Sequence, residues 1–122
     1  MKHEVIQFID VKELPTTEQA VLHDLSTEYY EKIRRSIKNL TSLAVHLKEY
    51  KKEGNRHKYV IHLRAISPSH TFTSTKAADW DLARTTHKAF EDVLTQIQHK
   101  LHSDQQKPSF QSGESQTPRK RS

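Results

Sequence analysis

Two segments of alternating apolar and polar residues, joined by one short turn, constrain the fold of this chain more than any other feature. The segments cover 43–50 and 58–65, and their apolar positions are Leu43, Val45 and Leu47, then Tyr59, Ile61, Leu63 and Ala65. A period of two residues predicts strands that bury one face. The residues between them, 51–55, include the glycine and asparagine that tight turns favour. We therefore expect an antiparallel hairpin.

The register of this hairpin follows from the position of its turn. Centring the turn on Gly54 gives the cross-strand pairs Val45 with Leu63, His46 with His62, Leu47 with Ile61, and Tyr50 with Lys58. In this register the apolar side chains share one face of the hairpin and the basic side chains share the other, as a single buried face requires.

Two elements are expected before the hairpin. Residues 5–9 are apolar and include β-branched side chains, which predicts a first strand. A helix over 17–37 follows, with Thr16 as its cap and Gln19 completing a capping box. The apolar stripe of this helix is Leu22, Leu25, Tyr29, Ile33 and Ile37.

Two more elements are expected after it. Pro68 ends the second hairpin strand, and 70–75 predicts a short fourth strand. A last helix begins near Asp79, its expected N-cap, and the neighbouring Trp80 is expected to pack over the sheet edge. The apolar stripe of this helix is Leu82, Thr86, Phe90, Val93, Ile97 and Leu101. The order β-α-β-β-β-α predicts an α+β two-layer sandwich, a four-stranded sheet with two helices on one face.

The composition indicates where this domain ends. The 122 residues suit one domain, yet only 33% of them are hydrophobic. From 103 onward Ser, Gln and Pro replace the periodic apolar pattern. We therefore expect a folded domain over 1–102 and a disordered polar tail over 103–122.

Several classes of protein are excluded by what the sequence lacks. Without cysteine there is no disulfide, Cys zinc site or Cys nucleophile. No apolar run is long enough to span a membrane, and no signal-peptide pattern opens the chain, so we expect a cytoplasmic protein. The nine histidines offer pairs but no third ligand, and no phosphate loop or catalytic triad is recognisable. We expect no metal, no cofactor and no enzymatic activity.

The exposed side of the predicted hairpin gathers positive charge. Its polar residues, with those of the turn, are His46, Lys48, Tyr50, Lys51, Lys52, Arg56, His57, Lys58, His62 and Arg64. Lys and Arg pair with phosphate oxygens and release counterions, and an aromatic ring such as that of Tyr50 can stack on a base. The alternative is a solvated strand face whose charges discourage edge pairing.

Three stretches carry a resemblance to a known family. They read Val45-His46-Leu47-Lys48-Glu49-Tyr50, then Gly54-Asn55-Arg56-His57-Lys58-Tyr59-Val60-Ile61-His62-Leu63-Arg64, then Trp80-Asp81-Leu82-Ala83 with Ala89-Phe90, Val93 and Gln96-Ile97. Together with the order of the elements, they resemble the ribosome hibernation-promoting factors. These proteins are also called ribosome-associated translation inhibitors or sigma-factor modulation proteins. The likeness covers about 3–102.

The resemblance implies a short-form stress-response protein that binds small-subunit rRNA where messenger and tRNAs would lie, and so silences idle ribosomes. It implies no small-molecule substrate and no membrane partner, and we expect a monomer when the protein is free. Family members are usually more basic along the last helix, where this chain has Glu91 and Asp92. The RNA-binding residues expected outside the hairpin are Arg34, Arg35, Lys38, Arg84 and Lys88.

Two other functions remain open at this point. A helix and three antiparallel strands before a last helix is also the order of a double-stranded-RNA-binding domain, although Asp79 and Asp81 would repel phosphate at the start of that helix. A protein-binding adaptor or sigma-factor modulator would instead bind through buried apolar anchors, with little dependence on salt.

Overall fold

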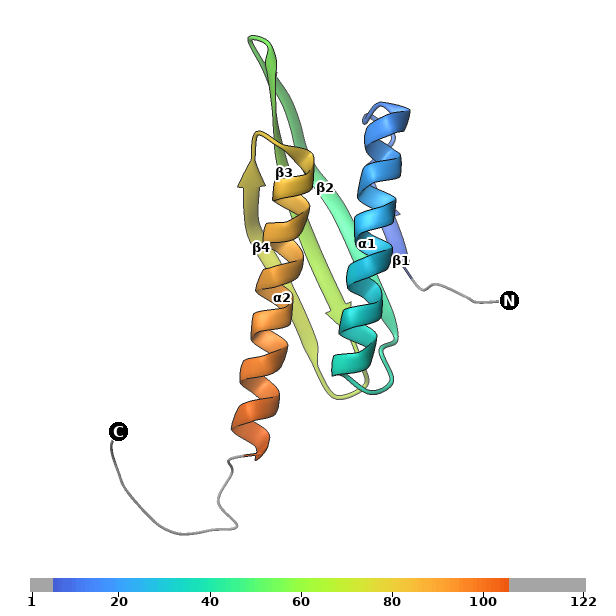
Figure 1. Cartoon of the computed structure of the whole chain (residues 1–122), viewed down its shortest axis with the longest axis vertical. Coiled ribbons are helices and arrows are strands. Elements are labelled where there is room, and N and C mark those ends of the chain that lie inside the picture. Colours follow the sequence, from blue (N-terminus) through green and yellow to red (C-terminus); the bar gives the residue numbers. More distant parts are fainter. Residues whose placement is uncertain (1–5, 106–122) are drawn as a thin grey trace, which may run out of the picture.

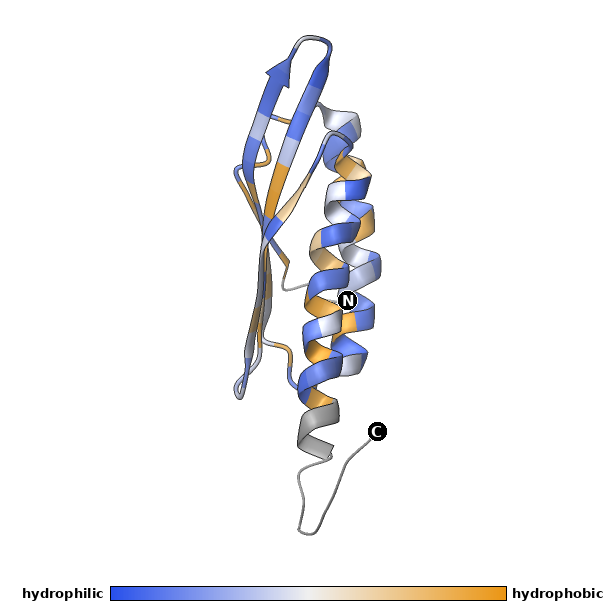
Figure 2. Cartoon of the chain, turned by 90° about the vertical axis from the view of Figure 1, so that its left-hand side faces the viewer, coloured by the Kyte–Doolittle hydropathy of each residue, from blue (hydrophilic) through white to orange (hydrophobic). Residues whose placement is uncertain are grey.

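The computed structural model describes residues 6–105 and confirms the predicted α+β fold and element order. The elements are β1 (Ile6–Ile9), α1 (Thr16–Ser36), β2 (Ser42–Glu53), β3 (Arg56–Ile66), β4 (Thr71–Asp79) and α2 (Leu82–Gln105) (Figure 1). The strands form one sheet in the order β1-β2-β3-β4, in which only β1 and β2 run parallel. Both helices cover the same face of the sheet, and within residues 6–105 the other face carries no helix (Figure 2).

The core lies between the sheet and the two helices. Its completely buried side chains come from both helical stripes and from the inner positions of the hairpin: Leu22, Ile33, Leu43, Val45, Ile61, Leu63, Phe90, Val93 and Ile97. The predicted stripe of α2 is wrong at one position, because Leu101 is exposed. The helix continues past the end of the sheet there, so none of the four described strands covers that turn (Figure 1).

The hairpin keeps its predicted register only in the half nearest the core. Val45 pairs with Leu63 and Leu47 with Ile61, as expected, but the register shifts between Leu47 and Glu49. Beyond that shift Tyr50 faces Tyr59 and not Lys58, which corrects the prediction. One extra residue, Lys48, is accommodated as a β-bulge.

The turn explains why a bulge is needed. Only Gly54 and Asn55 connect the strands, since Glu53 pairs with Arg56, and Gly54 has a φ of 63° that glycine adopts without steric cost. A two-residue turn requires partners whose residue numbers sum to 109, whereas the pairs in the core sum to 108. The bulge at Lys48 absorbs this one-residue difference.

Both predicted helix caps are wrong. Thr16 is the first residue of α1, and no side chain of the described residues caps this helix. Gln19 Nε2 donates to the Leu14 carbonyl at 2.8 Å. At α2 the Asp81 carboxylate accepts the Arg84 backbone N–H at 2.8 Å, as an N-cap does. Asp79 cannot take that role because it is still paired with Tyr59 at the end of β4.

The predicted boundaries need two further corrections. β4 extends to Asp79, four residues past the expected end at 75. α2 extends to Gln105, so the expected domain boundary at 102 falls inside the helix. The rest of the expected tail, 106–122, and residue Val5 of the expected first strand lie outside the described residues.

Candidate nucleic-acid interface

The β2–β3 hairpin projects beyond the N-terminal ends of both helices (Figure 1). Its tip, residues 51–56, is exposed throughout and carries Lys51, Lys52 and Arg56. Figure 2 shows that the projecting part is hydrophilic on both strands, in contrast to the apolar segment that packs under the helices. The projection forms because both strands continue past the segment in which apolar and polar residues alternate.

The bulge divides the predicted basic face between the two sides of the hairpin. Because side chains alternate along a strand, the side without helices carries His46, Lys51, Lys58, His62 and Arg64, and we call it the open face. Tyr50, Lys52 and His57 share the helix side with Tyr59. The prediction of one continuous basic face is therefore wrong.

Tyr50, which the sequence predicts to stack on a base, already stacks on another side chain of the protein. It is partly buried, its ring stacks on His57 with a centroid distance of 4.7 Å, and it lies 5.4 Å from the ring of Tyr59. Tyr59 in turn donates its hydroxyl to the Glu18 carboxylate at 3.0 Å. Burial, the hydrogen bond and the negative charge of Glu18 raise the Tyr59 pKa well above its ordinary value. This aromatic cluster fixes the base of the hairpin to α1.

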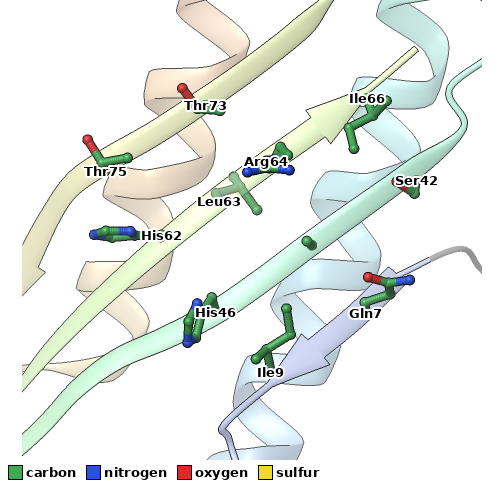
Figure 3. Close-up of a pocket in the computed structure, with 11 residues that line it drawn as sticks. Gln7, Ile9, Ser42, His46, His62, Leu63, Arg64, Ile66, Thr73 and Thr75 are labelled. Atoms are coloured by element: carbon green, nitrogen blue, oxygen red, sulfur yellow. The ribbon is translucent and has the colours of Figure 1, made fainter. Parts of the chain in front are cut away.

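A shallow depression of about 300 Å³ lies on the open face. In Figure 3, His46 from β2, His62 and Arg64 from β3, and Thr73 and Thr75 from β4 lie around it. Imidazole, guanidinium and hydroxyl groups all donate hydrogen bonds, so the depression offers several donors on one surface. The arrangement suits an anion such as a phosphate group.

The two histidines of the depression have different surroundings. His46 Nε2 lies 2.8 Å from Asp10 Oδ2, and Asp10 adopts a φ of 61°, a left-handed conformation that Asp tolerates. Burial and the positive charges of Lys48 and His46 lower the His62 pKa below its ordinary value. The lowered pKa favours the neutral form of His62, whereas the neighbouring Lys48 and Arg64 are positively charged.

The predicted RNA-binding cations differ among themselves in their ion pairing. Within residues 6–105, no acidic side chain pairs with Lys48, Lys51, Lys52, Lys58 or Arg64. Lys88 lies 2.8 Å and Arg84 3.8 Å from the carboxylate of Asp79. The hydrogen bond from Lys88, the Trp80 backbone N–H and the charges of Lys88 and Arg84 lower the Asp79 pKa. These two α2 cations therefore hold β4 to α2.

The α1 cations lie elsewhere. Arg34 and Arg35 occupy the last turn of α1 and Lys38 follows it, at the end of the molecule opposite the hairpin tip (Figure 1). Arg34 Nη2 also pairs with Glu31 at 2.7 Å. The structure thus brings the predicted hairpin residues together but separates them from Arg34, Arg35 and Lys38.

For Trp80, the sequence predicts only that the side chain packs over the sheet edge. Trp80 is 38% exposed, and the guanidinium carbon of Arg56 lies 4.1 Å from its ring centroid. The signal that could have identified it is its place in the connection between β4 and α2, because such connections run over the surface. Glu18 and Val21 of α1, hairpin residues and 80–83 line a groove of about 480 Å³ here, which we call the Trp80 groove.

The described residues carry no arrangement of three or more His, Asp or Glu side chains that could hold a metal ion. No helix within residues 6–105 is long and apolar enough to cross a membrane. The sequence matches no protein-family model, and no curated protein matches it.

Proposed function

We propose that this chain is a non-enzymatic, ribosome-binding translation inhibitor of the hibernation-factor type. It binds rRNA of the small subunit in the channel that messenger and tRNAs use, and so keeps idle ribosomes silent. The observation that carries this proposal is the projecting hairpin, whose cations face solvent without acidic partners among the described residues. Such a protein acts in the cytoplasm as a monomer and needs no cofactor.

The charge arrangement supports RNA over a protein partner. A cation that is paired with a carboxylate must break that ion pair before it binds phosphate. An unpaired lysine has no ion pair to break, and its contact with phosphate releases counterions from the RNA. Lys48, Lys51 and Lys58 are of the second kind and lie on one strand pair. The depression beside His62 and Arg64 adds hydrogen-bond donors to the same surface.

The rival functions have less support. A double-stranded-RNA-binding domain needs a basic start to its last helix, but here Asp79 and Asp81 stand there and engage Lys88 and the Arg84 backbone. An adaptor needs a contiguous apolar patch. The exposed large apolar residues of the described part are Ile9, Val21, Trp80 and Leu101, and only Val21 and Trp80 share a groove.

Sedimentation with ribosomes tests the proposal. We expect wild-type protein to travel with the small subunit or whole ribosome in a low-salt gradient, and Lys48→Gln/Lys51→Gln/Lys58→Gln to remain largely at the top. The matched control is Arg34→Gln/Arg35→Gln/Lys38→Gln, which removes the same charge from the opposite end. Wild-type protein at the top of the gradient would refute ribosome binding, and equal losses in both variants would refute the hairpin as its site.

A further inference from the structure

The Trp80 groove combines an exposed aromatic ring with a stacked guanidinium. Arg56 reaches from the hairpin tip over the ring of Trp80, which follows β4, so the pair joins two separate elements. The free surfaces of this pair are flat and polarisable. Aromatic rings and Arg guanidinium planes are the two groups on which proteins stack unpaired RNA bases. Val21, another exposed apolar side chain, lines the same groove.

Acidic side chains line the groove, and basic side chains lie beside it on the hairpin tip. Glu18 and Asp81 line the groove, and both carboxylates are already engaged, Glu18 by the Tyr59 hydroxyl and Asp81 by the Arg84 N–H. They disfavour a phosphate inside the groove but not a neutral base. Lys51 and Lys52 lie on the adjoining hairpin tip, where phosphates are favoured.

We propose that Arg56 and Trp80 form a stacking site for one unpaired nucleobase of RNA, whose flanking phosphates lie on the hairpin tip. The proposal rests on the proposed function insofar as that RNA is ribosomal. The stacking site restricts the target to RNA with unpaired bases, because a base inside an intact duplex has no free face to offer. It sets no preference among bases, since every base has a π-face.

The fluorescence of Trp80 reports on this site alone, because the chain contains one tryptophan. The probes are a short single-stranded oligoadenylate and an RNA of the same length without bases. We expect the oligoadenylate to change the emission of wild-type protein and the abasic RNA to leave it nearly unchanged. An equal response to both probes would overturn the stacking site, since both carry the same phosphates.

Affinity measurements on variants provide the second arm. We expect Trp80→Leu to weaken oligoadenylate binding about 5- to 100-fold, the usual effect of losing one base–aromatic stack, and to leave abasic RNA binding unchanged. Trp80→Phe retains most of the affinity, which separates stacking from folding. The charge control, Lys51→Gln, weakens both probes alike. An unchanged oligoadenylate affinity in Trp80→Leu would overturn the proposal.

Ribosome sedimentation separates this inference from the proposed function. Wild-type protein that travels with ribosomes but shows no base-dependent fluorescence change keeps the proposed function and overturns the stacking site. A base-dependent change without sedimentation supports the stacking site and refutes the ribosome as the target.

Discussion

At the scale of single residues, His62 reports on the charge of the open face. It lies opposite His46 in the hairpin, and burial and the charges of Lys48 and His46 lower its pKa. Arg64 is two residues further along the same strand. Asp10 contacts His46 from the β1 side of β2, which is the side away from His62. The neutral form of His62 is therefore favoured while the face around it stays positive.

The pKa of His62 yields a prediction at this scale. NMR titration should place it below the ordinary value of about 6.5. Lys48→Gln should move it upward, because one of the positive charges that disfavour protonation is removed. A His62 pKa at or above 6.5 in the wild type would contradict the arrangement of charges described for the open face.

The lowered pKa of His62 determines the direction in which stability changes with pH. A histidine whose pKa is depressed by folding favours the neutral form, so its contribution is present above pH 6.5 and is lost as the pH falls through the folded value. We expect the free energy of unfolding to fall less between pH 7 and pH 5 in His62→Gln than in the wild type. Denaturant titrations at the two pH values measure the difference.

At the scale of elements, the base of the projecting hairpin is attached to α1. The Tyr59 hydroxyl donates to both oxygens of Glu18, at 3.0 and 3.1 Å, and the Tyr50 and His57 rings stack beside it. Hydrogen bonds to charged groups typically contribute about 1.5–3 kcal/mol. Beyond the bulge, β3 still pairs with β4 at Tyr59 and Val60, but among the described strands residues 51–58 of the hairpin pair only with each other.

Tyr59→Phe tests this attachment. We expect a loss of about 1–3 kcal/mol in the free energy of unfolding, because phenylalanine cannot donate a hydrogen bond to the partly buried Glu18 carboxylate. Amide hydrogen exchange should quicken in 50–59 and stay unchanged in the core strand positions around Leu63. Lys52→Gln, on the same side of the hairpin but without such a bond, should change neither measurement. Unaltered exchange in Tyr59→Phe would show that the hairpin stands without α1.

The elements also show how far sequence patterns reach. Alternation located both hairpin strands and the register from Val45 to Leu47, because burial of one face fixes it. It did not reveal the bulge at Lys48, which reconciles the two-residue turn with the register of the core, and it therefore placed Tyr50 on the wrong side. The N-cap of α2 was misplaced for a similar reason, since only strand pairing shows that β4 continues to Asp79.

At the scale of the whole molecule, the distribution of cations depends on tertiary contacts. Composition and spacing identified the cations of the candidate interface, but they could not separate paired from unpaired ones. Lys88 meets Asp79 only because α2 packs against β4, and Arg34 is distant from the hairpin only because α1 runs back along the sheet. Within residues 6–105, the hairpin and the open face gather unpaired cations from two adjacent strands, whereas Arg35 and Lys38, which also lack acidic partners, lie at the opposite end.

The salt dependence of ribosome affinity tests this central claim most directly. Counterion release predicts a slope of roughly −0.7 to −0.9 in log K against log salt for each phosphate neutralised. We expect a steep slope for the wild type, a slope flatter by about 2 to 3 for Lys48→Gln/Lys51→Gln/Lys58→Gln, and a nearly wild-type slope for Arg34→Gln/Arg35→Gln/Lys38→Gln. A hairpin variant that binds ribosomes with the affinity and slope of the wild type would contradict the claim, because its basic residues would then be only a solvated surface.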